Sequence, residues 1–162
     1  MVTDMLKGER LVKAIASETG DANVIVCLDE SGNAVSAKGG DVFLDLSQGY
    51  ALARVGKGSL AARSIDVEDL RKAIREAARC HELLARADSL ISADGRFSVV
   101  DSPSSNTIWV RLTDDTGDMP PCRVEITVSL IRPGRILVVE RTKADYQTRR
   151  EVELLLGLEE GQ

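Results

Sequence analysis

Regular alternation of apolar and polar residues in the second half of the chain constrains the fold most. Four segments after Gly95 show it: 97–100, 107–113, 122–131 and 136–141. Successive side chains of a strand point to opposite faces, so this period predicts strands with one apolar and one polar face. Such strands are typical of an antiparallel sheet with one solvated side. We therefore expect a meander of four antiparallel strands here.

The two central segments define the two faces of this predicted sheet. One face would be apolar and built from Ile108, Val110, Leu112, Val124, Ile126 and Val128. The other would carry Trp109, Arg111, Arg123, Glu125 and Thr127. Trp and Arg on a half-polar face are typical of protein interfaces. The alternative, favoured about equally, is that a helix covers this face and that Trp109 belongs to the core.

The first half of the chain predicts a second group of strands. Residues 22–28 form a short, continuous apolar run that is rich in β-branched residues, the pattern of a strand covered on both faces. Turn residues follow it, so 34–38 should return as a hairpin partner. A third strand is expected at 42–46 and a fourth at 50–55, whereas the glycines of 47–65 leave that stretch largely undetermined.

Three helices complete the prediction, at 4–19, 67–87 and 143–157. The order α-β-β-β-(β)-α-β-β-β-β-α indicates the α+β class, with an antiparallel, meander-rich sheet of six to eight strands in total. A length of 162 residues fits one domain, 1–162. The alternative is two α-β halves, 1–65 and 66–162.

Charge and cysteine content limit the partners and the compartment. A net charge of −5 disfavours nucleic acid and anionic membranes as partners. Segment 132–150 is the exception, and its cations are Arg132, Arg135, Arg141, Lys143, Arg149 and Arg150. We expect a solvated strand–helix edge there, with nucleic-acid contact as the weaker alternative.

Three widely spaced cysteines indicate reduced, mostly buried thiols. No apolar run is long enough for a signal peptide or a membrane span, so we expect a soluble, cytoplasmic protein.

Few residue groups suggest catalytic chemistry. The single histidine, His81, is too few for an ordinary zinc site, so we expect neither a metal nor a cofactor. The glycine loop 56–59 lacks the spacing of a P-loop. An enzyme is therefore disfavoured. The alternative to be tested is a small-molecule or phosphate-ligand site between the sheet and helix 67–87, with candidate residues Arg54, Lys57, Gly58, Arg63 and His81.

The order helix, three strands, helix, strands, helix resembles that of small secretion chaperones, a similarity of element order alone. The opening helix and the segment VIVCLDESGNAV are similar to roadblock and profilin-type modules. We therefore expect a non-enzymatic, adaptor- or chaperone-like module that binds another protein or a second copy of itself as a homodimer. The candidate interface residues are Trp109, Arg111, Arg123, Leu154, Leu155 and Leu156.

Overall fold

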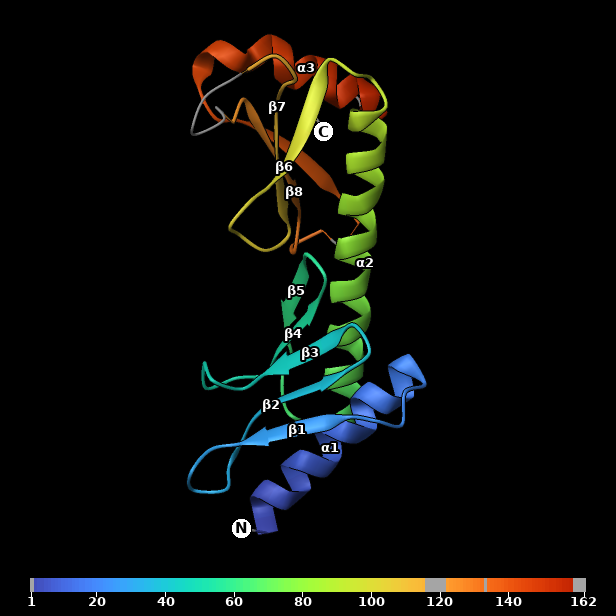
Figure 1. Ribbon diagram of the computed structural model, residues 1–162, viewed down its shortest axis with the longest axis vertical. Helices are drawn as coiled ribbons and strands as arrows, with labels where there is room; N and C mark the ends of the chain where they lie inside the picture. The colour runs from blue at the N-terminus through green and yellow to red at the C-terminus, as the bar shows by residue number, and fades with distance from the viewer. Residues whose placement is uncertain (1, 116–121, 133, 159–162) are drawn as a thin grey trace. The chain divides into compact units, whose positions relative to one another are not determined.

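The computed structural model describes residues 2–115, 122–132 and 134–158, and their side chains from Leu6 onward. Two antiparallel sheets and three α-helices form the described part, in the order α-β5-α-β4-α (Figure 1). The predicted α+β class, with antiparallel sheets and three helices, is confirmed. The nine described strands exceed the six to eight expected, and they form two sheets.

The first sheet has the order β1-β2-β3-β4-β5 and the second has the order β6-β7-β8-β9. The elements are α1 (Val2–Thr19), β1 (Ile25–Leu28), β2 (Ala34–Gly39), β3 (Val42–Asp45), β4 (Leu52–Val55), β5 (Gly58–Ala61), α2 (Val67–Ser92), β6 (Phe97–Asp101), β7 (Thr107–Leu112), β8 (Val124–Val128), β9 (Ile136–Glu140) and α3 (Tyr146–Leu155).

The chain divides into two compact units, Met1–His81 and Glu82–Gln162, and the boundary falls inside α2. The first unit holds α1, the first sheet and the first part of α2. The second holds the rest of α2, the second sheet and α3. The prediction of one domain over 1–162, and its alternative of two halves, stay predictions.

One face of the first sheet is buried beneath helices. Ala37, Leu44 and Ala53 are paired across β2, β3 and β4 and are at most 1% exposed. They belong to one hydrophobic cluster with Ile15 of α1 and Ile74 of α2. Removing such apolar surface from water stabilises by roughly 25 cal/mol per Å². The alanines leave room for the helices to approach the sheet closely.

The alternation predicted for the second sheet is present in the structure. Ile108, Val110, Val124 and Ile126 are buried on one face, whereas the residues between them are half-exposed. The alternation places Trp109 on the face opposite Val110. The last helix begins later than 143, because residues 143–145 form a 3₁₀ turn before α3.

Two expectations about the first sheet need correction. Strand β5 falls in the undetermined stretch 47–65, because its short Gly-Ser-Leu-Ala sequence has little β-propensity and no clear period. The run 22–28 was expected to be covered on both faces, and this is wrong. In the structure β1 is an edge strand, and three of its four residues are exposed.

Candidate functional site

The glycine turn between β4 and β5 packs against α2 within the first unit. The Lys57 amide donates to Nδ1 of His81 at 3.1 Å, so this nitrogen is the unprotonated acceptor. A Cβ on Gly58 would overlap the carbonyl oxygen of Ala77, and one on Gly56 would overlap the His81 ring. The structure thus brings Lys57, Gly58 and His81 together, and the turn and the helix pack directly against each other at this place.

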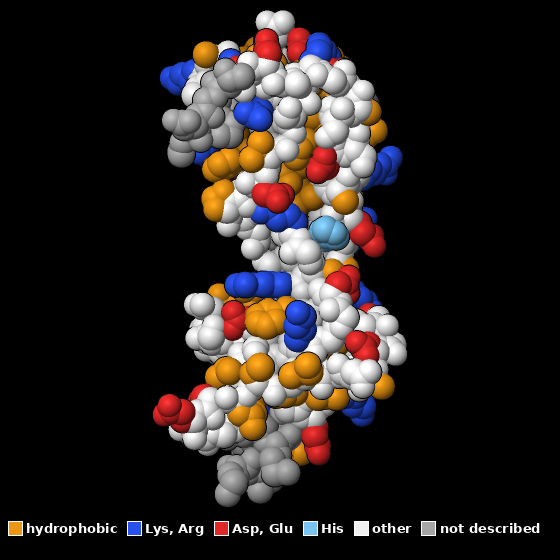
Figure 2. Space-filling model, viewed as in Figure 1, with side chains coloured by type: hydrophobic (Ala, Val, Ile, Leu, Met, Phe, Trp, Pro, Cys, Tyr) orange, Lys and Arg blue, Asp and Glu red, His pale blue; other side chains and the backbone are white. Residues whose placement is uncertain are grey.

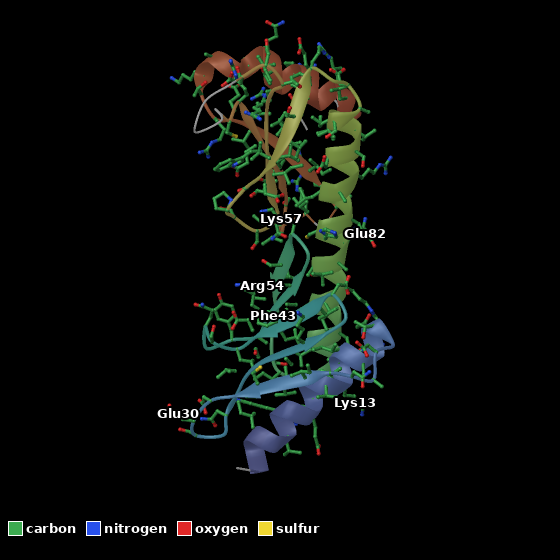
Figure 3. The ribbon with its side chains drawn as sticks, viewed as in Figure 1. Lys13, Glu30, Phe43, Arg54, Lys57 and Glu82 are labelled. Atoms are coloured by element: carbon green, nitrogen blue, oxygen red, sulfur yellow. The ribbon has the colours of Figure 1, made fainter. Side chains whose placement is uncertain are left out.

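Two other candidate ligand residues, Arg54 and Arg63, lie elsewhere in the first unit. Arg54 lies on the sheet face away from the helices, next to Phe43 of β3 and 3.8 Å from the Asp45 carboxylate (Figure 3). Arg63 lines a small depression of about 170 Å³ together with Asp69 and Lys72. Ligand pockets usually measure about 300–1,000 Å³, so this volume is small for a metabolite. The predicted pocket over helix 67–87 stays a prediction.

The open face of the second sheet holds Trp109 in internal contacts. The indole Nε1 donates to Glu125 at 3.2 Å. Arg141 donates to the same carboxylate at 3.2 Å and lies 5.4 Å from the centroid of the Trp109 ring. The Glu125 carboxylate thus accepts hydrogen bonds both from Trp109 on β7 and from Arg141 after β9. The indole is half-exposed.

The two arginines predicted to flank Trp109 are also engaged within the second unit. Arg111 donates to the Asp115 carbonyl at 2.9 Å. Arg123 donates to both oxygens of the Asp115 carboxylate, at 3.1 and 3.2 Å, and to the buried carboxylate of Asp145 at 3.1 Å. The hydrogen bonds from Arg123 hold the pKa of Asp115 below its usual value. This geometry gives both arginines a structural role.

The three leucines at the end of α3 differ in exposure. Leu154 is 66% exposed, whereas Leu155 and Leu156 are half-buried. Val152, on the same helix, is fully buried. Only Leu154 therefore offers a large apolar surface here.

Carboxylates within the second unit pair with several cations of segment 132–150. Arg141 pairs with Glu125, Arg149 with Glu140 and Arg150 with Glu153. Each pair reduces the local excess of positive charge, which weakens electrostatic attraction for a phosphate backbone.

The thiols differ from one another in environment. Cys80 is buried, Cys122 is half-buried and Cys27 on β1 is exposed, contrary to the expectation of mostly buried thiols. Burial raises the pKa of Cys122 to about 11 and also raises that of Cys80. Both therefore stay protonated at neutral pH and are poor nucleophiles. Among the described residues, no group of three His, Cys, Asp or Glu side chains could hold a metal ion.

Strand β1 is the most exposed of the described strands. Ile25 is 66% exposed and Leu28 is 59% exposed, and no residue of the strand is charged. Figure 2 shows hydrophobic side chains gathered over the strands of the first sheet. Edge strands are usually protected by charges, prolines or a covering segment, because their free backbone groups pair readily with another chain. In this structure β1 has no charge and no proline; it is short, with four residues, and its pairing with β2 shifts register between Cys27 and Leu28.

A groove of about 470 Å³ runs along β1 on the helix side of the sheet. Its floor and walls are mainly apolar and come from Gly8, Val12, Val26, Leu28 and Gly32. Glu9 and Lys13, one turn apart on α1, lie at its rim, where Figure 3 labels Lys13. Edge strand and groove together form one continuous surface, which we call the β1 surface.

The sequence predicts a strand at the residues of β1 but does not reveal its exposure. A continuous apolar run is common to edge strands and to doubly covered strands, so composition alone cannot separate the two. Gly8 inside a helix is the one local signal. No atom lies within 4 Å of the position that its Cβ would occupy.

No protein-family model matches this chain, and neither does any curated protein or solved structure with which it was compared. None of the described helices is both long and apolar enough to cross a membrane.

Proposed function

We propose that this protein is a non-enzymatic interaction module that binds a protein partner through the β1 surface. The single observation behind this proposal is the exposure of β1, an uncharged edge strand beside an apolar groove. The continuous apolar sequence of β1 is typical of a strand that is covered on both faces. A docked chain would supply the missing cover, pair the free backbone groups and fill the groove.

The chemistry of the groove supports binding rather than catalysis. Its ionisable lining groups, Glu9 and Lys13, are both exposed to water. Catalytic acids and bases are usually partly buried in a cleft, whereas these two side chains are open to solvent. Apolar walls with a charged rim are instead the composition of a protein-binding surface.

Photo-cross-linking in cells that naturally make the protein tests this proposal. Benzoylphenylalanine at position 28 would project into the groove, and the same residue at position 131 serves as the control. Ile131 is 93% exposed and belongs to the second unit. The proposal predicts a discrete protein adduct from position 28 and none of the same mass from position 131.

The identity of the cross-linked species decides between outcomes. A defined adduct, with a second copy of the chain or with another protein, supports the docking role of the β1 surface. The absence of any adduct at position 28, under conditions where the chain is folded, contradicts it. A small-molecule thermal-shift panel addresses the ligand alternative, which predicts a rise with a phosphate-bearing metabolite that Lys57→Ala abolishes.

A further inference from the structure

Resting on the proposed function, we infer that the occupant of the β1 surface is a second copy of this chain. The two β1 strands would pair antiparallel around a two-fold axis at Val26. This arrangement would join the two five-stranded sheets edge to edge.

The backbone of Val26 faces away from β2. The amide of Leu46 donates to the carbonyl of Val35, so the backbone groups of Val35 face β3. The β2–β3 register is regular from Ser36 to Gly39, so alternation along β2 turns the backbone groups of Ser36 and Lys38 toward β1. The register shift between β1 and β2 lies outside this stretch, between Cys27 and Leu28. The partners of Ser36 and Lys38 on β1 are Cys27 and Ile25. The N–H and C=O of Val26, between these two, therefore point out from the sheet edge.

A two-fold axis at Val26 fits both the hydrogen-bond phase and the faces of the strand. Val26 would pair with its own copy through two reciprocal N–H···O=C bonds. Ile25 would then lie opposite Cys27 of the second copy, both on the open face. Val24 would lie opposite Leu28, both on the groove face. Residues directly opposite each other in the two strands must lie on the same face of the sheet. A shift of the pairing by one residue would instead place groove-side residues opposite open-face residues. Only registers in which the two paired residue numbers add up to an even number, as 25 and 27 do, keep the faces matched.

The charges at the groove rim are complementary under the same axis. A Cβ on Gly39 would contact both Ile15 and Val24, which places these two residues at one level. Gly8 lines the groove with Leu28, so Val26 lies level with the α1 turn between Glu9 and Lys13. The axis would therefore bring Glu9 of each copy toward Lys13 of the other.

The spacing of the helices agrees with long charged side chains at this place. Helix α1 packs chiefly over β2. The two α1 helices would thus be about three strand spacings, or roughly 14 Å, apart. Directly packed helices lie about 8–10 Å apart, so only long side chains can bridge this gap. Glu and Lys are of that kind.

A second copy also accounts for the absence of charges and prolines on β1. Two-fold pairing is closed at this edge, because it consumes the β1 strands of both copies and leaves no β1 edge for a third chain. Each copy covers Ile25 and Leu28 of the other with the same uncharged strand.

Cysteine cross-linking tests the inference at a single residue pair. Residues 25 and 27 would form a non-hydrogen-bonded pair with Cα atoms about 4.5 Å apart, within the roughly 4.4–6.8 Å that disulfides span. Ile25→Cys should therefore convert most of the chain to a disulfide-linked dimer through native Cys27 under mild oxidation. The double variant Ile25→Cys/Cys27→Ser should stay unlinked, and so should Ile131→Cys, an exposed control in the second unit.

Light scattering on the unmodified protein completes the test, with a doubled mass expected. If the protein is a dimer but the 25–27 cross-link does not form, the proposed pairing of the two β1 strands is wrong. If the protein is a monomer at all concentrations and the cross-link does not form, the occupant of the β1 surface is not a second copy. In either case a position-28 photo-adduct with a different protein would preserve the proposed function. The absence of any adduct at position 28, with a second copy or with another protein, would remove both proposals. Circular dichroism confirms that each variant is folded.

Discussion

Gly58 lies closer to a neighbouring backbone than any side chain allows. A Cβ at this position would overlap the carbonyl oxygen of Ala77 in α2, and a backbone atom cannot move aside as a side chain can. Gly8 is the opposite case, because it is a helical glycine with open space around its missing side chain. The two glycines therefore give opposite predictions for the same substitution.

Gly58→Ala should lower the free energy of unfolding by about 3 kcal/mol, the order expected for a steric conflict in a packed site. Gly8→Ala should raise it by roughly 0.5–1 kcal/mol, because alanine restricts the unfolded chain and favours helix. Urea denaturation at one protein concentration measures both. Equal effects of the two substitutions would contradict the packing of the β4–β5 turn on α2.

Arg123 controls the ionisation of Asp115. Its hydrogen bonds hold the pKa of this carboxyl below the ordinary value in the folded state. The unfolded chain has the ordinary pKa, so the stabilisation is present above that value. It is lost as the pH falls through the lower folded-state pKa.

Arg123→Gln should therefore raise the pKa of Asp115 toward about 3.9, its value in unstructured peptides. A carboxyl titration followed by NMR measures this, with Arg141→Gln as the control because Arg141 pairs with Glu125 instead. The spectrum of each variant shows first whether the chain is folded. A folded Arg123→Gln protein with an unchanged Asp115 pKa would rule out this pairing.

At the scale of single elements, α3 separates a core position from a surface position within one turn. Val152 is fully buried, whereas Leu154 is 66% exposed. Val152→Ala should lower the free energy of unfolding by about 2 kcal/mol through lost burial and a small cavity. Leu154→Ala should change it by less than about 0.5 kcal/mol. Chemical denaturation of the two variants checks the orientation of α3, and a reversed ranking would contradict it.

The buried face of strands with strict alternation was predictable from the sequence, whereas the exposure of the uniformly apolar strand β1 was not. In β7 and β8 the period of two assigns each side chain to a face, and the burial of Val110 and Val124 follows it. The apolar run of β1 carries no period. Its position at the sheet edge depends on the order of strands, which local sequence does not encode.

The candidate site was less predictable than the fold for a related reason. Trp109 and Arg123 were selected for their residue types, yet their partners Glu125 and Asp145 lie on other segments of the chain. Only tertiary structure shows that such groups satisfy one another. Gly58 and His81 form a close contact for which neither residue carries a sequence motif.

For the molecule as a whole, the central question is whether the β1 edge is free or paired in solution. The structure describes one chain, in which this edge is uncharged, apolar and exposed. A second copy would change its solvent exposure more than that of any interior strand. The backbone amide of Val26 is the group that would report it.

Hydrogen exchange of the Val26 amide, followed by NMR at high protein concentration, shows whether the β1 edge is paired with a second copy. Its N–H faces away from β2, whereas those of Ile25 and Cys27 face β2. Pairing with a second copy predicts that Val26 is protected to a degree similar to these two neighbours, and that dilution removes its protection first. Rapid exchange of Val26 at every concentration, beside protected Ile25 and Cys27, would contradict the claim.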